Sequence, residues 1–217
     1  MGDARPTSGS IARVFPSAGW FAVWLLSATP PPTPASPLPS PLVDATAAVP
    51  GLVLDLRYAT PHNLVGEALY TNARCLLLPQ TAAALAHAQA LLQKQGLTLV
   101  AWDCYRPRGV QWALWKKQPT PGLVANPARG SNHNRGAAVD VSLQRLDGGA
   151  VELPTDFDDL SPQAASAATE GVSEVAQHNR RILKAAMRAA GFTSIRREWW
   201  HFDLVGALSL PVLNDEL

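Results

Sequence analysis

The chain has 217 residues, of which 47% are hydrophobic, which is enough for one domain with a proper core and short appendages. Its formal net charge of +1 gives no electrostatic basis for binding nucleic acid or an anionic membrane surface. The two cysteines exclude a disulfide-rich scaffold and a structural zinc site built from cysteines.

The first residues have the pattern of a secretory leader. Arg5 and Arg13 precede an apolar run over residues 18–28. This run is too short for a transmembrane helix, so we predict no stable membrane insertion, but it has the length of a signal-peptide core. We therefore interpret residues 1–28 as a signal peptide and expect a periplasmic or secreted protein. A leader that is not cleaved, with a cytoplasmic protein, is the alternative.

A proline-rich linker is predicted over residues 29–45, because seven prolines fall between Pro30 and Pro41. Proline fixes φ and removes a hydrogen-bond donor, so such a segment is extended and solvated. We place the folded domain at residues 46–207 and a loose tail at residues 208–217.

The first half of this domain mixes strands and helices. A turn at residues 61–63 follows the first strand, and Gly96 ends the first helix. Apolar periodicity predicts the following elements: a strand over 52–58, a helix beginning at Pro79, a strand over 97–102 and a short helix over 110–115.

A strand over residues 137–143 follows, with alternating faces. Val139, Val141 and Leu143 would share one face, and Asp140 would lie on the other. A carboxylate inside an apolar run is rarely buried without a partner, so we expect Asp140 to point into a cleft.

The last part of the chain continues without regular β-α alternation. Its predicted elements are a turn at 147–149 with a return over 151–153, a loop at 157–159, a helix over 177–190 ended by Gly191, and a strand over 199–205. This order favours an α+β fold with a central antiparallel sheet flanked by helices.

Two short stretches carry ligands for a metal. The loop before the central strand holds His133 and Gly136, which would let the loop turn tightly or let the backbone approach closely. The last strand holds His201. Two histidines and Asp140 are the ligands of a catalytic zinc with an open fourth position. Glu198 would be free to act on the metal-activated water, but a bend is needed, since a regular strand would point it away from His201.

With these residues, the chain resembles the zinc D,D-peptidases of the D-alanyl-D-alanine dipeptidase type. The resemblance rests on Ser131-x-His133-x-x-Gly136-x-Ala138-x-Asp140 followed by Glu198-x-Trp200-His201. Three further stretches fit, at residues 58–66, 103–107 and 157–158, so the similarity runs from about Leu52 to Val205. The resemblance implies a Hedgehog/D,D-peptidase-like fold, one Zn²⁺ per chain, a small dipeptide as substrate and a link to peptidoglycan metabolism.

The resemblance also implies roles for the other residues. Arg106 would stabilise the oxyanion of the scissile carbonyl, or would only form an ion pair with Asp103. Ser131 would help to bind the substrate carboxylate. Asp158 would receive the substrate ammonium, with a helix cap as its alternative role. Tyr58 would line the pocket around the amino end, or be a half-buried aromatic at an edge.

Two other functions stay open. One is a related zinc D,D- or L,D-carboxypeptidase or endopeptidase that acts on peptidoglycan stem peptides. The other is an inactive binding module that keeps zinc for structure, against which Glu198 and Arg106 argue, because structural zinc needs neither. Nothing in the sequence indicates an oligomeric state.

Cys75 and Cys104 depart from the pattern of the family, which usually has glycine at the position of Cys104. We expect two buried, reduced thiols, because nothing in the sequence brings their Cα atoms within bonding range. A disulfide formed in an oxidising compartment is the alternative, and it would tether the segment that carries Arg106.

Overall fold

The computed structural model describes residues 40–119 and 124–216. These residues belong to one compact unit that runs from Pro39 to Leu217. The predicted signal peptide and most of the predicted linker lie outside the described residues. Within the described part of the chain, no helix has the length and hydrophobicity needed to cross a membrane.

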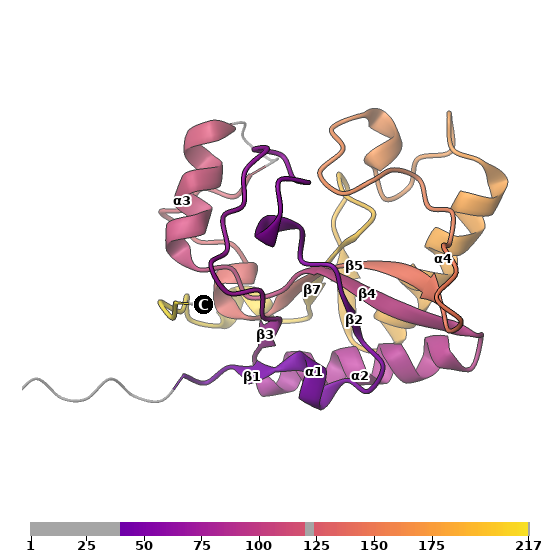
Figure 1. Cartoon of the computed structure of the whole chain (residues 1–217), viewed down its shortest axis with the longest axis horizontal. Helices are drawn as coiled ribbons and strands as arrows, with labels where there is room; N and C mark the ends of the chain where they lie inside the picture. The colour runs from indigo at the N-terminus through magenta and orange to yellow at the C-terminus, as the bar shows by residue number, and fades with distance from the viewer. Residues whose placement is uncertain (1–39, 120–123, 217) are drawn as a thin grey trace, which may run out of the picture. The chain divides into compact units, whose positions relative to one another are not determined.

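A five-stranded sheet forms the centre of the unit (Figure 1). Its strands, in spatial order, are β2 (Val53–Leu54), β4 (Leu97–Asp103), β5 (Ala138–Arg145), β7 (His201–Leu204) and β6 (Phe192–Ser194). Neighbouring strands are antiparallel, as predicted, except that β2 runs parallel to β4. The prediction of a wholly antiparallel sheet is therefore wrong at this edge. The connection from β2 to β4 contains a helix, and such a crossover brings the next strand back in the same direction.

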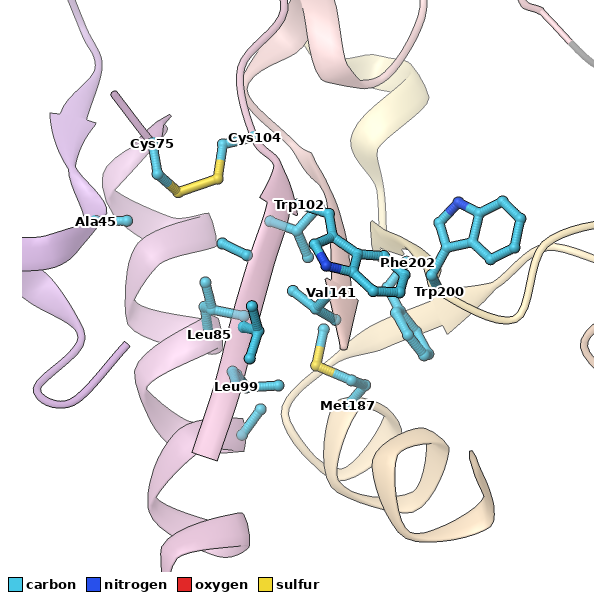
Figure 2. Close-up of a cluster of buried hydrophobic side chains, with 14 of the residues drawn as sticks. Ala45, Cys75, Leu85, Leu99, Trp102, Cys104, Val141, Met187, Trp200 and Phe202 are labelled. Atoms are coloured by element: carbon cyan, nitrogen blue, oxygen red, sulfur yellow. A yellow bond between two sulfur atoms is a disulfide. The ribbon is translucent and has the colours of Figure 1, made fainter. Parts of the chain in front are cut away.

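Helices α2 (Pro79–Gln93) and α4 (Glu174–Ala189) pack against each other and against the central strands. Figure 2 shows Leu85, Leu99, Val141 and Met187 gathered between these helices and the sheet. All four side chains are buried. The helix predicted from Pro79 and the one predicted over 177–190 are thus confirmed.

Aromatic rings form a second buried cluster. Trp102 lies on β4 at the irregularity between Ala101 and Asp103, where the register with β5 shifts and the regular alternation of side chains is interrupted. Its ring centroid is 5.5–6.5 Å from those of Phe157, Trp199 and Trp200. Because both faces of the sheet are covered, β5 is buried from residue 138 to residue 143, on the Asp140 side as well as the valine side.

Short pairings between distant segments extend this unit beyond the predicted boundaries. Strand β1 (Val43–Asp44) pairs with β3 (Leu76–Leu77), and helix α1 (Ala45–Ala48) begins at a fully buried alanine. The folded part therefore starts before residue 46, which is the predicted start of the domain. The first predicted strand is shorter than expected, because a turn of 3-10 helix (Arg57–Ala59) replaces its second half.

Two other predictions, in the second half of the chain, have different outcomes. The short helix predicted over 110–115 is confirmed as α3 (Arg108–Lys117). The turn at residues 147–149 forms, and Gln144 and Ala150 on its two sides make an antiparallel β-bridge. The predicted return segment over residues 151–153 is not a strand.

The C-terminal residues are not the loose tail that we predicted. A short 3-10 helix (Ala207–Ser209) is followed by a segment that hydrogen-bonds to the rest of the unit. The N–H of Leu213 donates to the carbonyl of Asn134 at 2.8 Å. The hydroxyl of Tyr105 donates to the carbonyl of Asp215 at the same distance. These contacts hold the tail against the loop that contains His133.

Cys75 and Cys104 form a disulfide, with their Cα atoms 5.1 Å apart (Figure 2). The expectation of two reduced thiols is therefore wrong. Strand β3 lies beside the segment after β4, where the N–H of Tyr105 donates to the carbonyl of Leu76 at 2.9 Å. Proximity of this kind depends on tertiary structure and leaves no local pattern in the sequence.

Candidate metal centre and active-site cleft

Three polar residues form a row across the sheet. Asp103 on β4 is the direct cross-strand neighbour of Asp140 on β5, and Asp140 is the neighbour of His201 on β7. Directly opposed residues in an antiparallel pair point to the same side of the sheet. The register of three strands therefore places a histidine and two carboxylates together.

His133 reaches the row from a turn of 3-10 helix (His133–Arg135) that precedes β5. The turn ends at Gly136, which has φ +63°. A Cβ atom at this position would lie 3.1 Å from the backbone nitrogen of Leu78. The predicted need for glycine is thus confirmed on both grounds, the left-handed conformation and the close approach of a neighbouring backbone.

The side chains of His133, Asp140 and His201 converge. The three offer donor atoms that lie within 4.8 Å of one another. Nε2 of His133 is 3.1 Å from Nδ1 of His201. Oδ1 of Asp140 is 2.9 Å from Nδ1 of His201 and 3.4 Å from Nε2 of His133.

The opposite nitrogen of each imidazole is held by a second partner. Nδ1 of His133 lies 2.7 Å from the backbone carbonyl of Cys104, which can only accept a hydrogen bond. Nε2 of His201 lies 2.9 Å from Oδ1 of Asp203. With a proton on each of these outer nitrogens, the inner nitrogens of both rings present lone pairs toward Asp140. Two lone pairs and a carboxylate that face one point repel each other unless a cation lies between them, so the donor set fits a divalent metal such as zinc.

Ionisation in this cluster also favours a cation. Burial alone would lower the pKa of His201, but its hydrogen bonds to Asp140 and Asp203 outweigh burial and raise that pKa well above its usual value. Burial would raise the pKa of Asp140, yet the two histidines outweigh it and lower that pKa well below its usual range. The cluster therefore stabilises positive charge beside an ionised carboxylate, either as a proton on His201 when no metal is bound or as a metal ion that displaces this proton.

Glu198 precedes β7 in a bend, as its proposed role requires. Its Oε2 atom lies 4.0 Å from Nδ1 of His201. Strand β7 begins only at His201, so the irregular backbone before it turns both side chains toward one point. Burial raises the pKa of Glu198 to about 7, although the positive charge of His201 opposes this shift.

Arg106 is held from two sides. Its Nε and Nη2 atoms donate to Oδ2 of Asp103 at 2.9 and 2.7 Å, and Nη1 donates to Oε1 of Gln111 at 2.9 Å. The guanidinium carbon lies 4.9 Å from the ring centroid of Tyr58. The ion pair with Asp103, the alternative role of Arg106, is therefore present. Nη2 is also 3.8 Å from Oδ2 of Asp140, so Arg106 borders the cluster as well.

Asp158 faces Tyr58 within the same cleft. Its Oδ2 accepts a hydrogen bond from the N–H of Leu64 at 2.9 Å and one from the hydroxyl of Tyr58 at 3.2 Å. Its φ of +58° is left-handed, which is uncommon for a residue other than glycine. Burial raises the pKa of Asp158 to about 6, against the effect of the hydrogen bond from Leu64. Tyr58 is 3% exposed, so it is a buried wall residue and not a half-buried edge aromatic.

Ser131 is buried at the start of the His133 turn. Its hydroxyl oxygen accepts a hydrogen bond from the N–H of His133 at 3.2 Å, and its own N–H donates to the side-chain oxygen of Asn134 at 2.7 Å. The residue therefore shapes the turn in addition to lining the cleft.

One cleft of about 1140 Å³ contains all the residues that the sequence suggested. Its lining includes Tyr58, Arg106, Ser131, His133, Asp140, Asp158, Glu198 and His201. These side chains come from six separate stretches of the chain, and the fold brings them together.

Two partners of the histidines were missed by the sequence analysis. Asp203 follows His201 by two residues on the same strand, and this spacing could have indicated it, because alternate residues of a strand share a face. The carbonyl of Cys104 could not have been found, since a backbone acceptor leaves no sequence signal. Gln111, which supports Arg106, was missed as well.

Comparison with known proteins agrees with this geometry. The model of the peptidase family described as D-ala-D-ala dipeptidase matches residues 40–216. A D-alanyl-D-alanine dipeptidase of Escherichia coli (strain K12) is 40% identical over 175 residues, which cover 81% of this chain and 90% of that protein. The D-alanyl-D-alanine dipeptidase of Enterococcus faecalis (strain ATCC 700802 / V583) is 31% identical over 179 residues, with 71% of this chain and 87% of that protein covered. The enzyme of the same name from Enterococcus faecium is 33% identical over 175 residues, with 71% and 86% covered.

Proposed function

The chain belongs to the D-ala-D-ala dipeptidase family, and from this premise we propose that it is a zinc metallopeptidase that hydrolyses D-alanyl-D-alanine to two molecules of D-alanine. The observation that carries the proposal is the convergence of His133, Asp140 and His201 beside the buried carboxyl of Glu198.

His133, Asp140 and His201 would hold one zinc ion. When bound, such an ion supplies a Lewis acid that polarises the scissile carbonyl and lowers the pKa of a water molecule. The carbonyl of Cys104 and the carboxylate of Asp203 orient the two imidazoles from outside. They keep the ligand nitrogens aimed at one point before the ion binds.

Glu198 acts as general base and then as general acid. It accepts a proton from the attacking water and delivers it to the departing amine. A group that must both take and give a proton works best when its pKa is near the working pH. Burial raises the pKa of Glu198 above its usual range, which offsets the lowering that a nearby cation would cause.

Arg106 stabilises the negative charge that develops on the carbonyl oxygen. Burial would lower the pKa of its guanidinium, but Asp103 outweighs this effect, so the group stays charged. Asp103 and Gln111 bind three of its nitrogens and fix its direction before substrate arrives.

Recognition of both charged ends would explain a preference for a free dipeptide. Asp158, supported by Tyr58, accepts the substrate ammonium, and Ser131 contributes to binding the carboxylate. A substrate whose amine is blocked would cover the buried Asp158 carboxylate without supplying a positive charge, which is costly. The same cost would exclude longer peptides extended at their amino end.

Substrate length tests this proposal. We expect hydrolysis of D-alanyl-D-alanine and at least ~10²-fold slower hydrolysis of its N-acetyl derivative, and the Asp158→Ala variant should lose most of this discrimination. Asp156→Ala, which removes an exposed carboxylate two residues earlier, is the matched control and should discriminate as the wild type does. Equal rates on both substrates, or activity on a pentapeptide stem, would instead favour a carboxypeptidase.

Export to the periplasm remains a further proposal. It is supported by the apolar run at residues 18–28 and by the disulfide, which persists in oxidising compartments. Mass analysis of the protein from fractionated cells tests it. A mature form that begins near residue 29 in the periplasm is expected, and a full-length chain in the cytoplasm would contradict export.

A further inference from the structure

The orientation of His133 depends on the segment that follows β4. The carbonyl of Cys104 accepts the hydrogen bond from Nδ1 of His133 at 2.7 Å. Two residues later, the N–H of Arg106 donates to the carbonyl of His133 at 3.2 Å, and the carbonyl of Arg106 accepts from Nδ2 of Asn134 at 2.6 Å. Residues 104–106 therefore hold both the ring and the backbone of this metal ligand.

This segment is in turn fastened to strand β3. The disulfide joins Cys104 to Cys75, the residue directly before β3. On the strand itself, the carbonyl of Leu76 accepts from the N–H of Tyr105 at 2.9 Å. At the end of the strand, the N–H of Leu78 donates to the carbonyl of Gly136, which closes the His133 turn, at 3.0 Å. Strand β3 thus contacts both segments that shape the ligand, and the disulfide is the covalent link among these contacts.

We propose that the Cys75–Cys104 disulfide is a positioning element for the metal centre, which fixes the Cys104 carbonyl against Nδ1 of His133 and so raises the affinity of the site for zinc. The inference rests on the proposed zinc site and concerns how that site is preorganised. Strand β3 has two residues and carries few ladder hydrogen bonds, so without the covalent bond the segment is held to it only by these backbone contacts. A shift of the acceptor rotates the imidazole and moves its ligand nitrogen away from Asp140 and His201.

The burial of the bridge favours a positional role over that of a redox sensor. Cys75 and Cys104 are 0% and 1% exposed, so a reductant cannot reach the sulfur atoms in the folded protein. Redox-sensing cysteines are solvent-accessible. The bridge therefore forms with the fold and persists as long as the fold does.

Zinc affinity of the Cys75→Ala/Cys104→Ala double variant tests the proposal. The zinc dissociation constant is measured by competition with a chromophoric chelator, at a temperature where circular dichroism shows a folded protein. We expect an increase of about 10–100-fold over the wild type, the usual effect of losing an outer partner of a metal ligand.

A control variant separates positioning from loss of stability. Leu183→Ala removes a fully buried side chain of α4 and lowers the melting temperature as well, but it should leave the zinc dissociation constant within about twofold of the wild type. The proposal is overturned if the double variant binds zinc as the wild type does, or if Leu183→Ala loses as much affinity as the double variant.

If the double variant does not fold, the measurement is made on the Cys75→Ser/Cys104→Ser variant, which also lacks the bridge and has no thiol that could bind zinc. The same two outcomes then decide. If the oxidised wild type itself binds no zinc, the proposed function fails, and this result is distinct from equal affinity with and without the bridge.

Discussion

Asp158 and Glu198 are both buried carboxyls of the cleft, yet their surroundings differ. Asp158 accepts hydrogen bonds from Leu64 and Tyr58, which stabilise its charged form and hold its pKa to about 6. Glu198 lies beside His201, and its pKa is about 7. Burial is the main cause of both shifts, so substrate or metal that brings positive charge would lower both values. The hydrogen bonds that stabilise the charged form of Asp158 suit it for binding a cation, and the position of Glu198 beside His201 suits it for proton transfer.

Binding of D-alanyl-D-alanine should weaken as the pH falls through about 6. Only the ionised form of Asp158 attracts an ammonium group, and the pKa of the free enzyme is raised, so protonation begins well above the usual range of aspartate. We expect the dissociation constant at pH 5 to be larger than at pH 7 by up to about tenfold, the ratio that a pKa of about 6 gives.

Calorimetry on the zinc-loaded Glu198→Ala variant measures this binding without turnover and without titration of Glu198. The control is the Glu198→Ala/Asp158→Asn variant, whose weaker binding should not change over the same pH range. A dissociation constant independent of pH in the presence of Asp158 would remove its proposed contact with the ammonium.

At the scale of single elements, β7 combines a ligand and its support. His201 and Asp203 share a face of this strand, and the carboxylate fixes the imidazole through Nε2. We expect Asp203→Ala to raise the zinc dissociation constant about 10–100-fold, because the ring loses its outer partner. Thr193→Ala, at the exposed cross-strand neighbour of Asp203 on β6, is the matched control and should bind zinc normally. Equal affinities in the two variants would show that Asp203 does not support the ligand.

Elements with a regular period of apolar residues could be predicted from the sequence. Elements that form only because segments far apart in the sequence pair with each other could not. Helices α2 and α4 and strands β4 and β5 were all located, because each has seven or more residues and a periodic apolar pattern. Strands β1, β2 and β3 have two residues each, which is too short for any period. They exist because partners far along the chain complete their hydrogen bonds, and the disulfide depends on the same pairing.

At the scale of the whole molecule, the cleft combines segments from residue 58 to residue 201. The motifs identified the side chains that line the cleft, since their chemical types and spacing are specific. The groups that support these side chains could be predicted only in part, because they include backbone carbonyls and residues that become neighbours only through the strand register. The tail shows the same limit. Its composition predicts a loose end, but its backbone hydrogen bonds to Asn134 and Tyr105 hold it against the loop that contains His133.

Two measurements on the wild type and on Glu198→Gln test the proposed chemistry as a whole. They are the release of D-alanine from D-alanyl-D-alanine and the zinc content of the protein. We predict one zinc per chain in both proteins, turnover by the wild type that a chelator abolishes and zinc restores, and at least ~10²–10⁴-fold less turnover by the variant. The substitution keeps the size of the side chain and the three ligands but removes the base. A zinc-loaded wild type that releases no D-alanine, or a Glu198→Gln variant as active as the wild type, would contradict the account.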